Sequence, residues 1–564
     1  MTTLTPRTPY SQEELNKLYP KGLELRLVQV LLRHGERAPV SARFGNAGLP
    51  AYWPYCNAAQ RLRSVTMTTD DVSKWDSLQW RRRLETFGND DGPLVAAGPA
   101  GEVDGICQFG ELTDKGRQTT YELGRRLRHL YVDQLHFMPK LIANADLIYL
   151  RATPLPRALE SVQQTFWGMY PLTARTASFP APTIVTRTPA DETLFPNDGN
   201  CRRFAQLSRA FAQRAADRWN ETDDMRYLTK LMGKWMPESS PNVAVDSHPR
   251  LSGIMDTINS TLAHGRETRL PKEFYDTKAR DIIDRIGVEE WFAGYNENRE
   301  YRTLGIGSLM GDIVERMTSK VEGAGLSINE IGGENGRLGK GRGGEMGIRF
   351  AMSGCHDTTL AGVLTSLGAF NGEKWPPYTS HIAFELFRAR NDEESDESGK
   401  AVEFLTPTRP TSTEPKAQGT KPGLFASLLG LRGSEAQSSP TNGSSGPLST
   451  PRLGRGSDIA TSIPPKDLVA RSAWSELSEK QKERLDGYYV RVRFNDKVMR
   501  VPACAKEGNN YQGDDTLCTF EAFKRVCDSY TPRNWKVQCG QNLDQPVDGL
   551  ESPAQMAGQI ENGF

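Results

Sequence analysis

Three short clusters of arginine, histidine and aspartate have residue types that suit phosphate chemistry. The first, at 33–39, is Arg-His-Gly-Glu-Arg-Ala-Pro; the second holds Arg151 and Arg157; the third is His356-Asp357. A guanidinium group presents a planar pair of donors that matches phosphate oxygens, and the contact is charge-assisted. Gly35 is expected to let the backbone turn sharply beside the histidine and approach a ligand. Together the clusters predict a phosphate pocket.

Each cluster follows a segment that is predicted to be a buried strand. Apolar runs at 25–32, 143–150 and 348–353 precede the three clusters, as expected for strands of a parallel sheet. Ligand sites in open α/β sheets lie outside the carboxyl ends of the strands, so the clusters should converge. The alternating segments 381–387 and 488–494 predict two more strands.

Helices are predicted between these strands, which gives an α/β fold. Leucines at helical spacing indicate helices after 112 and after 357, and Thr153-Pro154 is predicted as the N-cap and first residue of another. That start places Arg157 well inside its helix, where a structural ion pair is expected. Glu36 is expected at the rim of the pocket.

The rest of the chain is expected to be organised around this core. The predicted segments are an N-terminal extension (1–24), the first part of the core (25–199) with a surface excursion (41–109), a mainly helical cap (200–322), a glycine-rich loop (323–347), the second part of the core (348–390), a disordered low-complexity insertion (391–472), the C-terminal part of the core (473–550) and a tail (551–564). The composition of 391–472 cannot bury enough apolar surface to offset its ordering entropy. The stretch 332–347 is not a P-loop, because Gly341 stands where Ser or Thr is required.

Composition limits the partners. Lys plus Arg and Asp plus Glu are 70 each, so no basic surplus supports a nucleic-acid partner. No apolar stretch approaches the roughly 20 residues of a transmembrane segment, and no signal peptide is seen. A cytoplasmic location is predicted, with a mitochondrial one as the alternative. The apolar segment 423–431 is either a docking helix for a partner or membrane surface, or an inert segment.

The eight cysteines are dispersed and include no CxxC pair. They are predicted to be mainly buried, reduced thiols. Cys504 and Cys518 flank a Gly/Asn/Asp loop and are the best candidates for a disulfide, which would contribute about 3 kcal/mol in an oxidising compartment.

The motif Arg-His-Gly-x-Arg-x-Pro at 33–39, with a distant His356-Asp357, resembles the histidine acid phosphatase branch of the histidine phosphatase superfamily. The likeness extends through 110–118 (GELTDKGRQ), 150–161 (LRATPLPRALES), 196–201, 353–370 (SGCHDTTLAGVLTSLGAF) and the region of Cys504 and Cys518. With Lys-Trp-Pro-Pro at 374–377, the spacing most resembles the lysophosphatidic acid phosphatases. The likeness to this family is loose over 41–109 and absent over 391–472.

The resemblance implies a mixed central sheet with helices on both faces, as in phosphoglycerate mutases, and metal-independent hydrolysis of phosphate monoesters without a cofactor. It implies that His34 is the nucleophile, forming a phosphohistidine, and that Asp357 is the proton donor. Arg33, Arg37, Arg151 and His356 would bind the phosphate, and these arginines would supply the positive charge that a metal could otherwise give. Because aspartate ordinarily titrates near pH 3.9, an acidic working pH is expected.

Substrate and function alternatives remain. A small phosphomonoester or a lysophospholipid of the lysophosphatidic acid type is the leading substrate class. Phytase or another inositol-phosphate phosphatase is the alternative, disfavoured by the zero net charge and the lack of a visible signal peptide. A catalytically weak phosphate-binding scaffold is the alternative from another class, and the presence of both His34 and Asp357 argues against it.

Overall fold

The computed structural model describes residues 2–71, 73–323, 347–390 and 472–547. The expected glycine-rich loop, low-complexity insertion, apolar segment 423–431 and tail lie outside the described residues, apart from residues at their edges. In the described part, no helix is long and apolar enough to cross a membrane.

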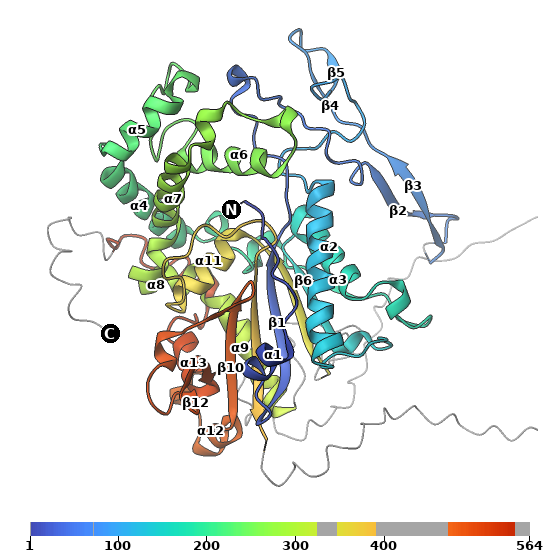
Figure 1. Ribbon diagram of the computed structural model, residues 1–564, viewed down its shortest axis with the longest axis vertical. Helices are drawn as coiled ribbons and strands as arrows, with labels where there is room; N and C mark the ends of the chain where they lie inside the picture. Colours follow the sequence, from blue (N-terminus) through green and yellow to red (C-terminus); the bar gives the residue numbers. More distant parts are fainter. Residues whose placement is uncertain (1, 72, 324–346, 391–471, 548–564) are drawn as a thin grey trace, which may run out of the picture. The chain divides into compact units, whose positions relative to one another are not determined.

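A mixed sheet forms the centre of the fold, and this confirms the predicted fold class (Figure 1). Its strand order is β12-β13-β10-β9-β1-β8-β6-β7, with β11 paired to β10. Strands β1, β8, β6 and β7 run parallel, while β9, β10 and β13 are antiparallel to their neighbours. The bounds are β1 Leu23–Arg33, β6 Ile148–Ala152, β7 Ile184–Val185, β8 Phe350–Cys355, β9 His381–Ala389, β10 Tyr488–Phe494, β11 Lys497–Met499, β12 Asn510–Tyr511 and β13 Asp514–Thr519.

Successive side chains of β1 point to opposite faces of the sheet and contribute to two hydrophobic cores, one on each face. Leu27 and Leu31 pack on one face, and Val28, Val30 and Leu32 pack on the other. Helices α2 and α3 cover the second face, while α9, α11 and α13 cover the first (Figure 1). The helices are α1 Gln12–Leu18, α2 Asp114–Arg128, α3 Pro156–Met169, α4 Arg202–Trp219, α5 Asp223–Met232, α6 Leu251–Ala263, α7 Thr277–Glu297, α8 Arg299–Arg302, α9 Ser308–Glu322, α11 Asp357–Ser366, α12 Glu479–Leu485, α13 Phe520–Asp528 and α14 Trp535–Gln538.

The segment predicted as a helical cap is helical, but its last long helix, α9, lies against the central sheet. Gln29 on β1 donates from Nε2 to the carbonyl of Ile313 on α9 at 3.0 Å. Helices α5 to α7 share a separate hydrophobic core with the start of the excursion, where Phe44 and Trp53 are buried. The excursion is therefore a surface segment only in its later part.

That later part forms two hairpins, β2–β3 and β4–β5 (Figure 1). Strand β2 spans Arg61–Met67 and β3 spans Trp75–Arg81, while β4 spans Glu85–Phe87 and β5 spans Pro93–Val95. Neither pair joins another strand among the described residues.

Three disulfides are present, so the prediction of mainly reduced thiols is wrong. They join Cys56 to Cys107, Cys201 to Cys539 and Cys504 to Cys518, and only the last was anticipated. Cys355 and Cys527 are free and buried. Two bridges link cysteines 51 and 338 residues apart, which spacing alone could not have paired.

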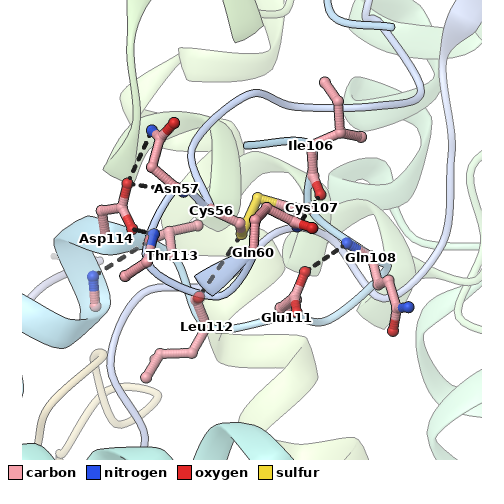
Figure 2. The surroundings of a disulfide bond; sticks show 12 residues. Cys56, Asn57, Gln60, Ile106, Cys107, Gln108, Glu111, Leu112, Thr113 and Asp114 are labelled. Atoms are coloured by element: carbon pink, nitrogen blue, oxygen red, sulfur yellow. Dashed lines mark hydrogen bonds between the residues drawn. A yellow bond between two sulfur atoms is a disulfide. The ribbon is translucent and has the colours of Figure 1, made fainter. Parts of the chain in front are cut away.

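The Cys56–Cys107 disulfide lies beside the start of α2 (Figure 2). The Asp114 carboxylate accepts from the backbone of Asn57 at 3.0 Å and of Ala58 at 2.9 Å. Gln60 donates from Nε2 to the carbonyl of Ile106 at 2.8 Å. Both ends of the loop that carries the hairpins are thus fixed at one place on the core.

Candidate active site

The parallel strands β1 and β8 bring the first and third clusters together at their carboxyl ends. Their register pairs Arg33 with Cys355, so the residues that follow emerge side by side. The His34 backbone N–H donates to the Cys355 carbonyl at 3.2 Å, and the ring centroids of His34 and His356 lie 5.6 Å apart. The predicted convergence of these clusters is confirmed.

The His34 imidazole is held in one tautomer by its own loop. Its side chain is buried, and Nδ1 lies 2.8 Å from the carbonyl oxygen of Gly35. Since a carbonyl oxygen only accepts, Nδ1 carries the proton, and the lone pair of the neutral ring is on Nε2. Burial lowers the pKa of His34 well below its ordinary value, and the positive charges of Arg157, Arg33 and Arg37 lower it further. The ring is therefore neutral under acidic conditions.

Arg33 and Arg37 from the first cluster are fixed by carboxylates and by a tyrosine ring. Arg33 pairs with Asp357 at 2.7 Å, and its Cζ lies 4.2 Å from the ring centroid of Tyr378. Arg37 pairs with Asp256 on α6 at 2.7 Å. Helix α6 and the segment before β9 thus help to aim the two guanidinium groups.

Arg151 was predicted to bind phosphate, but its side chain is buried and forms ion pairs inside the protein. Arg151 on β6 is paired with Ser353 on β8, and Ser353 is paired with Leu31 on β1. Arg151 therefore lies level with Leu31 in the sheet, two residues before Arg33. There its guanidinium group binds the buried carboxylates of Glu192 at 2.8 Å and Asp312 at 3.2 Å. Its assignment to the phosphate pocket is corrected.

Arg157 lies where Arg151 was expected. Helix α3 begins at Pro156, not at Pro154, so Arg157 is in the first turn at the end of β6. Its charge is the largest electrostatic influence on the pKa of His34. Within the described ranges, Arg157 has no ion-pair partner, and burial together with Arg37 lowers its pKa to about 10. The expected structural ion pair is therefore absent there, and an unneutralised guanidinium group acts on the histidine.

Asp357 is the first residue of α11 and belongs to a network of donors. Its Oδ2 accepts from Trp375 Nε1 at 2.9 Å as well as pairing with Arg33. Burial opposes its ionisation, but Arg33, the Trp375 hydrogen bond and Arg37 outweigh burial, so the pKa of Asp357 is lowered. Without a ligand, this carboxyl group is ionised except at strongly acidic pH.

His356, in the third cluster, contacts the segment that follows β6 and leads to Arg157. Its Nε2 is 3.1 Å from the hydroxyl oxygen of Thr153, which follows β6. Burial and the charge of Arg157 lower its pKa, while Asp357 acts in the opposite direction. Like His34, it is predominantly neutral across the mildly acidic range.

Gly35 and Glu36 differ from their expected roles. A Cβ on Gly35 would lie 2.3 Å from the carbonyl oxygen of Gly116, so this glycine is required for close packing on α2. Glu36 is buried, not at the rim, and accepts from the hydroxyl groups of Thr3 at 2.7 Å and Thr119 at 2.5 Å. Both residues therefore fix the segment that carries His34 against helix α2.

A cavity of about 350 Å³ adjoins Arg33 and lies between α6, α7 and the segment 374–377. Its apolar lining includes Met255, Ile258, Ile283 and Trp375. Apart from Arg33, its charged lining consists of two cations and two carboxylates: Arg280, Lys374, Asp281 and Asp284. Among the described residues, no group of three or more His, Cys, Asp or Glu side chains could hold a metal ion.

Sequence reasoning missed Asp256, Tyr378 and Trp375 as parts of the site. Asp256 and Tyr378 carry no local motif, because they reach the arginines only through packing of α6 and of the loop before β9. Trp375 lies in the conspicuous Lys-Trp-Pro-Pro segment, which was a usable signal.

Sequence comparisons with known proteins point to one family. A family profile described as histidine phosphatase superfamily (branch 2) matches residues 24–406. A probable acid phosphatase of Schizosaccharomyces pombe is 34% identical over 521 residues, covering 92% of this chain and 95% of that protein. Lysophosphatidic acid phosphatase type 6 of Homo sapiens is 23% identical over 376 residues, covering 65% and 74%.

Among solved structures, the phytase of Hafnia alvei in complex with myo-inositol hexakis sulphate aligns at 11% identity and a TM-score of 0.47, covering 92% of this chain and 99% of that chain. The profile spans most of the core, and the fission yeast relative spans nearly the whole length of both chains. This chain therefore belongs to the histidine phosphatase superfamily (branch 2) and is an acid phosphatase of the histidine acid phosphatase family.

Proposed function

We propose that His34 Nε2 attacks the phosphorus atom of a phosphate monoester and forms a phosphohistidine. The observation that carries this proposal is the tautomer: Nδ1 donates to the Gly35 carbonyl, which leaves the Nε2 lone pair free. The low pKa of His34 keeps that lone pair available in acid. Covalent attack divides one difficult displacement into two easier steps.

The phosphoryl oxygens are bound by Arg33, Arg37 and Arg157, with His356 beside them. All three arginines act on His34 electrostatically, so a group bonded to its Nε2 experiences their combined charge. Fixed positive charge at this position stabilises the additional negative charge of the transition state. Arg157 is the most available of the three, since Arg33 and Arg37 are already paired with carboxylates.

Asp357 supplies the proton for the leaving alcohol. As the N–P bond forms and the bond from phosphorus to the alcohol oxygen breaks, the proton of the Asp357 carboxyl group moves to that oxygen. A water molecule then attacks phosphorus, Asp357 takes its proton, and phosphate leaves a neutral His34. A bound phosphate offsets the charge of Arg33, which raises the pKa of Asp357 and allows it to be protonated at mildly acidic pH.

The substrate carries a single phosphate and an alcohol with apolar character, as in lysophosphatidic acid. The apolar side chains of the cavity beside Arg33 suit such an alcohol, and beyond Arg33 its charges balance. An inositol polyphosphate would need a surplus of positive charge that this cavity lacks. The similarity to lysophosphatidic acid phosphatases supports the same choice.

The test is steady-state hydrolysis of lysophosphatidic acid, p-nitrophenyl phosphate and inositol hexakisphosphate at acidic pH in the presence of EDTA. Wild type is compared with His34→Ala, and His129→Ala, an exposed histidine on the helical segment after α2, is the matched control. We expect the highest kcat/KM for lysophosphatidic acid, loss of all activities in His34→Ala, and an unaltered control. Retained activity in His34→Ala would refute the nucleophile, and a preference for inositol hexakisphosphate would refute the substrate class.

The location that we propose is an oxidising compartment. Disulfides persist outside the reducing cytosol, and three of them are formed here. The predicted cytoplasmic location loses support for this reason. Mass measurement of protein from native cells, alkylated without reduction, tests this: two alkylated cysteines are expected after denaturation, whereas eight would contradict the proposal.

A further inference from the structure

The β2–β3 hairpin exposes large apolar side chains that no other part of the described chain covers. Val65, Met67 and Trp75 are 69%, 58% and 55% exposed, and Trp80 on the other side is 48% exposed. Side chains of this kind are normally buried or belong to an interaction surface. None of the residues described above as part of the site belongs to this hairpin.

The register of the hairpin separates its side chains into two different faces. Residues directly opposite each other in an antiparallel pair point to the same face, and successive residues alternate. One face, here called the basic face, carries Arg61, Arg63, Val65, Met67, Trp75 and Arg81, with Ser77 and Gln79 between them. The opposite face carries Leu62, Ser64, Thr66, Asp76, Leu78 and Trp80.

The basic face has three arginines and no carboxylate, although the chain as a whole has no net charge. None of these three arginines forms an ion pair within the described residues, and all three are exposed. Tryptophan and other apolar side chains next to arginines without ion pairs form a combination suited to the interface between lipid headgroups and acyl chains. Arginine side chains can bind lipid phosphates while their stems remain among apolar groups.

The hairpin is held firmly enough to act as a docking element. The backbone N–H of Arg82 donates to the carbonyl of Gln60 at 3.0 Å, which closes the base of the ribbon. Arg82 also pairs with Glu111 at 2.5 Å. Glu111 lies near the Cys56–Cys107 disulfide (Figure 2). The base is therefore anchored to the core, while both strands remain exposed along their length (Figure 1).

We propose that the basic face of the β2–β3 hairpin docks this phosphatase on membranes that contain anionic lipids. The arginines bind the headgroup phosphates, and Val65, Met67 and Trp75 enter the interface. A membrane is favoured over an acidic protein because the apolar side chains lie together at the turn end of the face and the arginines lie toward its base. Such a face can place its apolar end in the lipid interface while its arginines bind headgroup phosphates. The proposal does not require that the substrate be a lipid, because docking and hydrolysis use different residues.

The experiment measures co-sedimentation with vesicles of phosphatidylcholine, with and without phosphatidylserine, at low and high salt. Wild type should bind the anionic vesicles and release them at high salt. Trp75→Ser should weaken binding roughly tenfold by removing apolar contact, whereas the matched control Trp80→Ser, on the opposite face, should bind like wild type. Arg61→Gln combined with Arg81→Gln should weaken binding roughly 25-fold.

Hydrolysis of p-nitrophenyl phosphate, a soluble substrate, shows whether each variant is folded and should remain unchanged in all of them. The proposal is overturned if wild type does not bind anionic vesicles, or if Trp80→Ser weakens binding as much as Trp75→Ser. It is also overturned if wild type is a dimer that Trp75→Ser dissociates, since a second copy would then cover the face. The arginine variant retains both tryptophans and therefore decides the outcome if Trp75→Ser does not fold.

Discussion

Replacing Arg157 should lower activity and replacing Arg151 should lower stability, although the two arginines are only six positions apart. Arg157 has no ion-pair partner in the described chain and acts on His34. Arg151 forms ion pairs with two buried carboxylates in the protein interior. Substitution Arg157→Gln should therefore impair turnover, and Arg151→Met should impair folding.

The magnitudes follow from these environments. Loss of one fixed donor to transition-state charge costs about 3 kcal/mol, so kcat of Arg157→Gln should fall about 10²-fold. Removing Arg151 leaves the carboxylate of Glu192, which is buried, without its partner, and breaking a buried pair in this way costs about 3–5 kcal/mol of stability. Arg157→Gln should lose less than about 1 kcal/mol, because no ion pair is broken.

Two measurements on the same samples separate the effects. Steady-state hydrolysis of p-nitrophenyl phosphate gives kcat, and equilibrium unfolding in urea gives the free energy of unfolding. The pH profile of kcat/KM adds a third result: removing the positive charge of Arg157 raises the pKa of His34, so the acid limb should move to higher pH. Arg125→Gln, which breaks only an exposed pair with Glu122, should alter none of these quantities.

A stable Arg151→Met variant with strongly reduced kcat, beside an active Arg157→Gln variant, would refute this assignment. It would mean that Arg151 binds substrate despite its two carboxylate partners.

Three further predictions concern the network around the site. Trp375→Phe removes a hydrogen bond that favours ionised Asp357, so the pKa of this carboxyl rises and the alkaline limb of kcat/KM should move to higher pH; an unmoved limb would contradict this. Binding of vanadate should take up a proton at mildly acidic pH as Arg33 is neutralised, which calorimetry in buffers of different ionisation enthalpy would detect; binding without proton uptake would count against Asp357 as the acid. Gly116→Ala would place a Cβ 2.2 Å from the carbonyl oxygen of Glu36, so urea unfolding should show a loss of about 2–3 kcal/mol, and a wild-type value would contradict the packing argument.

The elements that the sequence predicted well are those whose signal is local. Strand β1 is an apolar run that ends at a charged motif, and the structure has it at Leu23–Arg33. Strand β10 has the predicted bounds because the period-two alternation of its apolar residues is a local signal for a strand. The convergence of His34 with His356 follows from parallel pairing of β1 and β8, a general rule of α/β sheets.

The predictions that were wrong concern residues whose positions depend on tertiary geometry. A helix start displaced by two residues changed the apparent position of Arg157, because each residue turns a helix by about 100°. The burial of Arg151 depends on the register between β6, β8 and β1, and a sequence does not state register. The Cys201–Cys539 bridge depends on tertiary proximity of segments 338 residues apart.

The Cys56–Cys107 disulfide makes the segment between its cysteines a replaceable module. The two Cα atoms lie 5.0 Å apart, so the chain leaves and re-enters the core at almost the same point. A short turn could span that gap, and segments with adjacent ends tolerate insertion, deletion and exchange. Evolution or a protein engineer can therefore change what the segment recognises while the phosphatase core keeps its structure.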